Sequence, residues 1–353
     1  MLLIRVDGSV QIGTGHVMRC LSLAAAWSAA GGQIHFVLAE CTPALHARLD
    51  EFGAATTMLK VAPGSTADAV ATIALADKLT PSWIVADGYS FGTEWQKQVH
   101  TAGYELLVFD DYGHAAHYYA DVILNQNLDA LAELYASRES YTQLLLGTSY
   151  AVLRPEFNKW REWRRQIRET AQAVLITLGG ADPNNVTSTI MDALSPLTNL
   201  TIVLAIGGTN PHRSVVERII SGMASPVQLM IDATTMGELM AEADVAIAAG
   251  GTTSWELAFM GLPSIVVTLA DNQRRIVAAL TRSGISVDAG AIESLDFAER
   301  LRSSLTRLAG SPVTRKRMSE LGRKQVDGFG AKRVVGLMLT SGSSEQCLAR
   351  AAQ

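Results

Sequence analysis

The segment Asp7–Cys20 carries residue types suited to ligand binding and catalysis. Gly13 and Gly15 allow a ligand to approach the backbone, and the helix expected to begin there offers free N–H donors. His16 follows directly. Because the N-terminus of a helix disfavours a cation, we expect this imidazole to be neutral near pH 7 and able to act as a general base. A structural role, in which His16 only caps the turn through a hydrogen bond to the backbone, explains its position equally well.

Arg19 lies three residues after His16, on the same face of the expected helix, where it can reach a phosphate group. An ordinary surface ion pair is the more common role of such an arginine. The two glycines, together with Glu40 after the next strand, also make half of a dinucleotide-binding fingerprint, but Met18 occupies the place of its third glycine. A nicotinamide-dependent oxidoreductase is therefore a weaker alternative, and we expect no cofactor.

Two glycine-pair turns in the second half of the chain favour binding of a nucleotide diphosphate. Each follows an expected strand and precedes a helix, where backbone N–H groups and hydroxyls can hold phosphate without a metal. Glu256, on the first helical turn, can accept hydrogen bonds from ribose hydroxyls. The alternative is a tight turn with Thr or Ser as the N-cap. The expected nucleotide ligands are Gly179, Gly180, Gly250, Gly251, Thr252, Thr253, Ser254 and Glu256.

The loop Asp110–His117 contains two aspartates and two histidines, which are residue types that bind metal ions. The His-x-x-His spacing on a loop is not specific for a metal site. We therefore expect no metal.

Short apolar runs that end in glycine or an acid alternate with helical stretches, the pattern of βαβ units around a parallel sheet. The strands expected in the first half are Leu2–Val6, Ile34–Leu38, Trp83–Ala86, Glu105–Phe109 and Val122–Leu124. Those expected in the second half are Val174–Leu178, Thr201–Ala205, Val227–Ile231, Val245–Ala248 and Ser264–Val267. Because open parallel sheets bind ligands beyond the carboxyl ends of their strands, we expect an α/β fold of two Rossmann-like domains whose parallel sheets face each other across a cleft.

The domain boundary is expected near Pro155, which favours an extended preceding residue. A polar linker helix should follow over Glu156–Glu169, with one apolar stripe and solvated arginines on its other faces. An apolar stripe in Ala331–Leu339 predicts a last helix that crosses back to the first domain. We divide the chain into residues 1–153 (N-terminal Rossmann-like domain, with the candidate base), 154–170 (linker helix), 171–340 (C-terminal Rossmann-like domain, with the turns expected to bind a nucleotide diphosphate) and 341–353 (tail).

Composition narrows the classes of protein that remain. The length of 353 residues suits two domains, and 48 % hydrophobic with 18 % charged residues suits a packed core. A net charge of −5 provides no global basic field, so no nucleic-acid partner is expected, and the arginines of the linker helix are better explained as a solvated face.

No apolar run reaches the roughly 18 residues of a membrane span, so we expect no membrane insertion. Arg5 and Asp7 interrupt the N-terminus too early for a signal-peptide core. Three cysteines without CxxC spacing argue against a disulfide framework or a zinc cluster. We expect a reduced, cytoplasmic protein, and the pattern leaves its oligomeric state open.

Several motifs together resemble one family. They are Arg5-x-Asp7-x-Ser9-x-x-Ile12-Gly13-x-Gly15-His16-Val17-Met18-Arg19-Cys20-Leu21, Leu153-Arg154-Pro155-Glu156-Phe157, Gly179-Gly180-Ala-Asp182, Gly251-x-Thr253-x-Trp255-Glu256 and Asp271-Asn272-Gln273. The family is the UDP-2,4-diacetamido-2,4,6-trideoxy-β-L-altropyranose hydrolase of pseudaminic acid biosynthesis, a pathway linked to flagellin glycosylation. It is similar in fold to the peptidoglycan N-acetylglucosaminyltransferase, a glycosyltransferase-B-like pair of Rossmann domains. The Gly-x-Gly-His-x-x-Arg segment is the most specific part of a match that spans about Leu3 to Gln273.

The resemblance implies metal-independent, inverting hydrolysis of the anomeric C–O bond of a UDP-sugar, with release of UDP. It assigns the catalytic base to His16, sugar-binding positions to Tyr89 and Asn272, and the uridine ribose to Glu256. Proteins named as spore-coat or polysaccharide glycosyltransferases share the opening motif, so a UDP-sugar glycosyltransferase is the main alternative. A UDP-sugar sensor without turnover is a further one.

Overall fold

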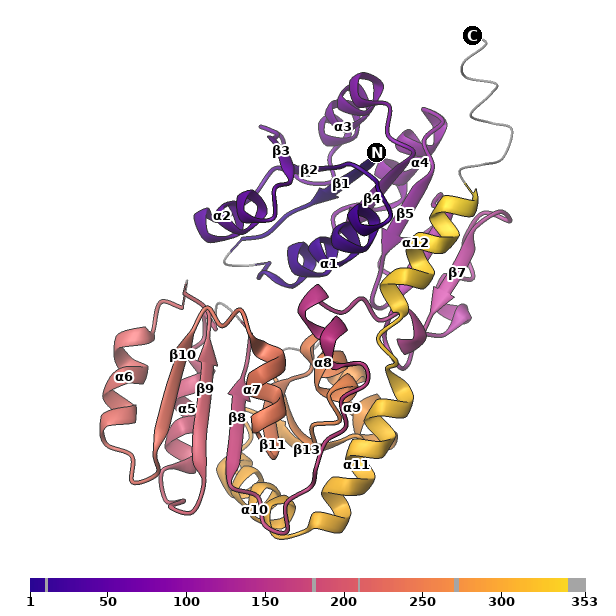
Figure 1. Ribbon diagram of the computed structural model, residues 1–353. Coiled ribbons are helices and arrows are strands. Elements are labelled where there is room, and N and C mark those ends of the chain that lie inside the picture. Colours follow the sequence, from indigo (N-terminus) through magenta and orange to yellow (C-terminus); the bar gives the residue numbers. More distant parts are fainter. Residues whose placement is uncertain (10–11, 180–181, 209, 270–272, 342–353) are drawn as a thin grey trace. The chain divides into compact units, whose positions relative to one another are not determined.

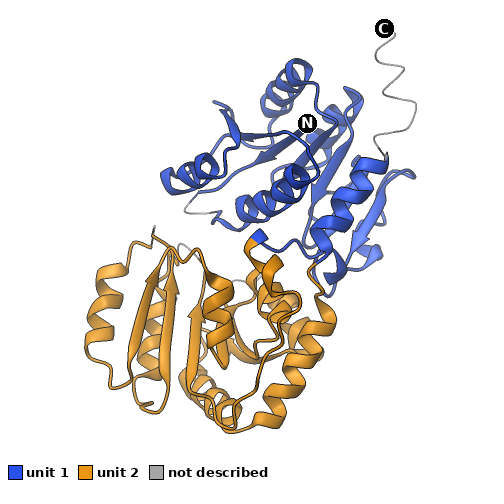
Figure 2. Cartoon of the chain, in the orientation of Figure 1, with its two compact units in different colours: residues 1–155, 329–353 blue, residues 156–328 orange. Residues whose placement is uncertain are grey.

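The computed structural model describes residues 1–9, 12–179, 182–208, 210–269 and 273–341. The chain forms two compact units, which are treated separately (Figure 2). Unit 1 comprises residues 1–155 together with residues 329–353, and unit 2 comprises residues 156–328. Within the described residues, no helix is both long and apolar enough to cross a membrane.

Unit 1 is built on a seven-stranded parallel sheet with the order β3-β2-β1-β4-β5-β6-β7. Its strands are β1 (Leu2–Val6), β2 (Ile34–Leu38), β3 (Ala55–Met58), β4 (Trp83–Asp87), β5 (Leu106–Phe109), β6 (Val122–Asn125) and β7 (Gln143–Leu146). Its helices are α1 (Gly15–Ala29), α2 (Pro43–Glu51), α3 (Thr66–Leu79), α4 (Thr93–Thr101) and α12 (Gly330–Ser341), with 3₁₀ turns at Ala132–Tyr135 and Thr148–Tyr150.

Alternation along β1 explains the two cores of unit 1. Leu2, Ile4 and Val6 pack with α1 and α12 on one face of the sheet, whereas Leu3 packs into the core beneath α3 and α4 on the other. Successive side chains of a strand point to opposite faces, so an apolar run such as this one needs helices on both sides.

The last helix returns to unit 1, as its apolar stripe predicted. α12 lies beside α1 (Figure 1). Val334, Val335 and Met338 are buried in the core that contains α1, and the indole of Trp83 donates to the backbone oxygen of Met338 at 2.9 Å. A Cβ at Gly330 would lie 2.2 Å from the Ala151 oxygen, so the helix starts in close contact with the Thr148–Tyr150 turn. The expected end of the second domain at residue 340 is therefore wrong, because the chain leaves unit 2 at Gly328.

Unit 2 repeats the architecture with a six-stranded parallel sheet in the order β10-β9-β8-β11-β12-β13. Its strands are β8 (Ala173–Thr177), β9 (Thr201–Ile206), β10 (Val227–Ile231), β11 (Val245–Ala249), β12 (Ser264–Thr268) and β13 (Ser286–Ala291). Its helices are α5 (Val186–Leu194), α6 (Arg213–Ser221), α7 (Met236–Glu242), α8 (Thr253–Phe259), α9 (Arg274–Arg282), α10 (Phe297–Ala309) and α11 (Pro312–Gln325). Counted within each unit, the first six strands follow the order 3-2-1-4-5-6, so the expected pair of Rossmann-like domains is confirmed.

The linker helix expected over Glu156–Glu169 is wrong. The chain forms only a 3₁₀ segment, Pro155–Trp160, and then runs without a helix to β8. The guanidinium of Arg165 is the main physical reason, because it donates to the backbone oxygens of Met240 and Ala243 at 2.5 Å each. These carbonyls lie at the end of α7, where no intrahelical donor remains. Tertiary contacts of this kind override the local helical pattern.

Candidate functional site

The sheet of unit 1 has its switch point between β1 and β4, where the chain connections lead in opposite directions. Open α/β sheets bind their ligands at the carboxyl edge of such a point. β1 leads through the glycine-rich turn into α1, so His16 is the second residue of that helix. Asp87 is the last residue of β4 and is in register with Val6 of β1. Gly13 has a φ of 82°, a conformation that favours glycine and turns the chain toward the helix start.

His16 and Asp87 form a close pair at this switch point. The Nδ1 atom of His16 lies 2.5 Å from Oδ1 of Asp87, whose side chain is fully buried. Arg19 donates to the same carboxylate through Nε at 2.6 Å and Nη2 at 2.7 Å. Burial alone would raise the pKa of Asp87, but the charges of Arg19 and His16 outweigh it and hold that pKa well below its usual value. Asp87 is therefore an anion at neutral pH.

The charge of Asp87 determines which nitrogen of His16 is available for chemistry. An ionised carboxylate only accepts hydrogen bonds, so Nδ1 must carry the hydrogen and the lone pair of the neutral ring lies on Nε2. Nε2 has no hydrogen-bond partner among the residues that the structure describes, and the side chain is partly exposed. The geometry is that of a histidine base oriented by a carboxylate. If His16 only capped the turn, its imidazole would bond to the backbone there, but Nδ1 is directed to Asp87 instead.

Arg19 is buried and connects two carboxylates. Its Nη1 atom contacts both oxygens of Asp111 at 2.9 and 3.1 Å, while its other nitrogens hold Asp87. Arg19 is therefore neither a surface ion-pair partner nor a side chain free to bind phosphate, the two roles expected from the sequence. Arg19 holds the carboxylate of Asp87 in place beside His16, and its Nη2 atom also lies 3.2 Å from Nδ1 of His16.

Tyr89 lies beside the imidazole, at the position that the resemblance assigned to sugar binding. Its ring meets the ring of His16 edge-on, with centroids 5.2 Å apart, and the residue is 37 % exposed. Its hydroxyl donates to Oδ2 of Asp111 at 2.8 Å, so Asp111 fixes both Tyr89 and Arg19. Two other expected ligands, Asn272 and Gly180, lie outside the described residues.

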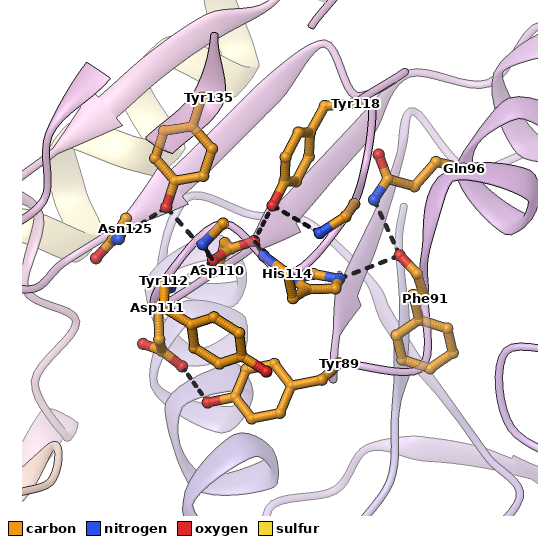
Figure 3. Close-up of polar contacts among 12 residues, drawn as sticks. Tyr89, Phe91, Gln96, Asp110, Asp111, Tyr112, His114, Tyr118, Asn125 and Tyr135 are labelled. Carbon is orange, nitrogen blue, oxygen red and sulfur yellow. Dashed lines mark hydrogen bonds and ion pairs between the residues drawn. The ribbon is translucent and has the colours of Figure 1, made fainter. Parts of the chain in front are cut away.

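Asp110, the neighbour of Asp111, is the centre of a separate buried network (Figure 3). It accepts from Nδ1 of His114 at 2.6 Å, from the hydroxyls of Tyr118 and Tyr135, and from the backbone amides of residues 112–114. The second histidine of the metal-like motif, His117, pairs instead with Glu139. The four polar residues of the motif thus do not converge, and no group of three or more His, Cys, Asp or Glu side chains in the described part of the chain is placed to hold a metal ion.

The glycine-pair turns of unit 2 leave two neighbouring strands, β8 and β11, at the switch point of their sheet. Gly179 has a φ of 99°, and the carboxylate of Asp182 beyond it accepts from the amides of Val186 and Thr187 at 2.8 Å each. The N-cap residue of α5 is Asn185, which has a φ of 53° and makes no side-chain capping bond, so Asp182 satisfies the first free amides of the helix in its place.

The second turn, residues 250–256, is tightly packed at Gly250 and open at Gly251. A Cβ at Gly250 would lie 2.6 Å from Cγ2 of Val277, so only glycine fits there. Thr252 is the N-cap of α8 but makes no side-chain capping hydrogen bond, whereas the hydroxyl of Ser254 approaches the Ala249 oxygen at 3.5 Å. Gly251 and Thr253 lie in the same turn, and Glu256 is buried on the first turn of the helix.

These two units and their switch-point turns define the architecture of glycosyltransferase-B proteins. The solved structure of Acinetobacter baumannii MurG superposes with a TM-score of 0.66 over 96 % of this chain and 99 % of its own, at 15 % identity. The spinosyn rhamnosyltransferase SpnG complexed with thymidine diphosphate gives a TM-score of 0.61 over 95 % of this chain and 99 % of its own, also at 15 % identity. At such identities the likeness concerns the fold alone. Residues 173–325 match the glycosyltransferase family 28 C-terminal domain.

Curated relatives confirm the resemblance drawn from the motifs. The UDP-2,4-diacetamido-2,4,6-trideoxy-beta-L-altropyranose hydrolase of Campylobacter jejuni is 26 % identical over 289 residues, 81 % of this chain and 98 % of that protein. The uncharacterized protein MJ1062 of Methanocaldococcus jannaschii is 24 % identical over 76 % of this chain. The spore coat polysaccharide biosynthesis protein SpsG of Bacillus subtilis is 26 % identical over 53 % of this chain. The matched region spans 55 % of each of the last two proteins, about half of their length.

Proposed function

We propose that the protein is an enzyme that hydrolyses a UDP-linked 2,4-diacetamido-2,4,6-trideoxy sugar at its anomeric C–O bond, releasing UDP and the free sugar. The reaction needs no metal or cofactor and belongs to pseudaminic acid biosynthesis in the cytoplasm. The observation that carries the proposal is the His16–Asp87 pair, which leaves Nε2 as an open base beside Tyr89. The Campylobacter hydrolase, matched over 98 % of its length, supports the choice of substrate.

The proposed chemistry uses one base. Nε2 of His16 takes a proton from a water molecule while the water oxygen attacks the anomeric carbon, on the face opposite the leaving group. The bond between that carbon and the diphosphate oxygen breaks, and its electron pair leaves with UDP. Asp87 stabilises the imidazolium that forms, because its carboxylate already accepts from Nδ1.

The leaving group explains why one base is sufficient. UDP is already a stable anion, so the reaction requires donors that hold its charge rather than a general acid. We assign this role to unit 2, where the turn at residues 250–256 and Gly179 would bind the diphosphate. Glu256 would accept hydrogen bonds from the ribose hydroxyls. In unit 1, the turn of Gly13 and Gly15 would let the substrate approach His16 closely.

A glycosyltransferase that uses the same donor is the second candidate. The match of residues 173–325 to a glycosyltransferase C-terminal domain favours it. Its chemistry would differ only in the nucleophile, because the same histidine would deprotonate an acceptor hydroxyl in place of water. Release of UDP in the absence of any acceptor separates the two functions.

The test is incubation of the purified protein with a panel of UDP-sugars, with UDP and free sugar followed by NMR. His16→Ala should lower turnover by roughly 10²–10⁴-fold, the usual contribution of a general base, and leave UDP affinity unchanged. His46→Ala is the matched control, because His46 pairs with Asp50 on the exposed face of α2 and should tolerate the change. A His16→Ala protein that melts early but hydrolyses at nearly the wild-type rate would show that this histidine only stabilises the turn.

A further inference from the structure

The turn formed by residues 110–114 follows β5 and is held from within by its own first residue. Oδ1 of Asp110 accepts from the amides of Tyr112 and Gly113 at 2.7 Å each, and Oδ2 accepts from Nδ1 of His114. The carboxylate is buried and is held from the other side by Tyr118 and Tyr135. Such a network allows the turn few alternative conformations.

This buried anchor positions the next two side chains of the turn, which have different roles. Asp111 points to Arg19 and Tyr89 and so belongs to the network around His16. Tyr112 presents its ring to solvent, and the residue is 39 % exposed. The Tyr112 hydroxyl makes no hydrogen bond among the described residues. The contact that the structure gives this side chain beside Tyr89 is therefore made by its ring.

The rings of Tyr112 and Tyr89 lie next to each other, with centroids 4.9 Å apart and an interplanar angle of 52° (Figure 3). Tyr89 in turn contacts His16, so the pair continues directly from the proposed base. The hydroxyl of Tyr89 is bound to Asp111, which fixes the direction of its ring. Single exposed aromatic residues are common on protein surfaces, but two in contact beside a histidine base form a continuous apolar surface at a site.

We infer that Tyr112 and Tyr89 form an aromatic wall that binds the apolar face and the methyl groups of the sugar moiety, and that Tyr112 is a specificity-determining residue. The inference rests on the proposed function, since the occupant is the sugar of the nucleotide-sugar substrate. That sugar has a methyl group at C6 and two acetamido methyl groups, all of which gain by leaving water for a ring surface. A sugar with a hydroxyl at C6 would lose hydration of that group against the same rings and gain no partner.

The experiment compares steady-state kinetics of Tyr112→Ala, Tyr112→Phe and the wild type on the UDP-linked diacetamido-trideoxy sugar, with UDP affinity measured by calorimetry. Tyr112→Ala should raise KM by roughly 2- to 10-fold, the range for loss of one aromatic contact, with kcat within about twofold of the wild type. UDP affinity should not change, because UDP lacks the sugar. Tyr112→Phe keeps the ring and should keep the wild-type KM.

Tyr141→Ala is the control for loss of an exposed tyrosine in the same unit, since Tyr141 stacks on His100 and has no contact with His16. It should leave KM unchanged. A folded Tyr112→Ala protein with the wild-type KM would contradict the inference that Tyr112 binds the sugar. A fall in kcat with KM unchanged would contradict it as well, because that result indicates that the turn only supports Asp111. If the wild-type protein releases UDP from no UDP-sugar, the proposed function fails, and this inference fails with it.

Discussion

Asp87→Asn tests the proposed base with the smallest change in shape. The substitution keeps the volume of the side chain and removes its negative charge. Asp87 accepts from Nδ1 of His16, from two nitrogens of Arg19 and from Sγ of Cys20, so the neutral amide weakens four contacts at once. An amide does not compensate the charge of the imidazolium, and it can hold the ring in the wrong tautomer.

The expected magnitude follows from the contacts. Loss of the oriented base should lower kcat by about 10²–10⁴-fold, which corresponds to roughly 2.7–5.4 kcal/mol of barrier at 1.36 kcal/mol per factor of ten. Removing one partner of a buried ion pair costs about 3–5 kcal/mol of folding free energy. Because Arg19 keeps Asp111, we expect the low end, about 3 kcal/mol, and therefore a melting temperature lower by roughly 6–12 °C.

The assay measures UDP release, UDP affinity and melting temperature on one preparation, at a temperature where the variant is folded. Asp68→Asn is the matched control, because Asp68 is equally buried in unit 1 and binds Arg5 through both oxygens at 2.8 and 2.9 Å. It should lose comparable stability and keep its turnover per folded molecule. An Asp87→Asn protein that is folded and turns over within about threefold of the wild type would refute the assignment of Asp87 as the residue that orients the base.

Three further predictions concern the nucleotide, metal independence and pH. Glu256→Ala should weaken UDP binding by about 1–3 kcal/mol, the cost of charge-assisted hydrogen bonds to ribose, and unchanged affinity by calorimetry would contradict this role. EDTA should leave UDP release unchanged, whereas inhibition that added metal reverses would restore a metal site to consideration. Burial disfavours the charged forms of Asp110 and His114, but their hydrogen bond outweighs it, so the pKa of Asp110 lies below its ordinary 3.8 and that of His114 above its ordinary 6.5. The contribution of this pair to the stability of unit 1 should therefore be complete between about pH 4 and 6.5, with the part of His114 lost as pH rises through its folded-state pKa and that of Asp110 lost as pH falls through its own. Melting curves of His114→Gln, which should show no extra loss on the alkaline side, test the assignment.

The strands that sequence patterning did not predict lie at sheet edges. β3, β7 and β13 each pair on one side only, so their residues need not be continuously apolar. β3 is a four-residue strand with exposed ends, and β13 is interrupted by Asp288 and Gly290. The predicted interior strands are buried on both faces and are mainly apolar, with Arg5 of β1 as a buried exception, which is why they could be placed to within a residue or two.

The linker shows the opposite error, in which a local pattern predicted an element that does not form. Trp160, Trp163 and Ile167 have helical spacing, but Trp160 packs over Gly237 and Arg165 caps the end of α7. Both partners are distant in sequence. The spacing of apolar residues shows only which side chains would share a face if a helix formed. It contains no information about backbone carbonyls elsewhere in the chain that lack a hydrogen-bond donor, such as those at the end of α7.

The partner of His16 was within reach of the sequence, but its identity depended on strand order. Acids or amides follow several expected strands, among them Asp7, Glu40, Asp87 and Asp110, and any of them is a plausible partner from position alone. In the order 3-2-1-4, β4 lies next to β1 on the side of the switch point, so the residue that ends β4 is the one delivered to the start of α1. Topology therefore selects Asp87.

The adjacent residues Asp110 and Asp111 show what strand order does not determine. Both follow β5, but the carboxylate of Asp110 turns inward to Tyr118, whereas that of Asp111 turns to Arg19. Only the three backbone amides that close the turn on Asp110 decide between them, and a hydrogen-bonded turn of this kind leaves no periodicity in the sequence.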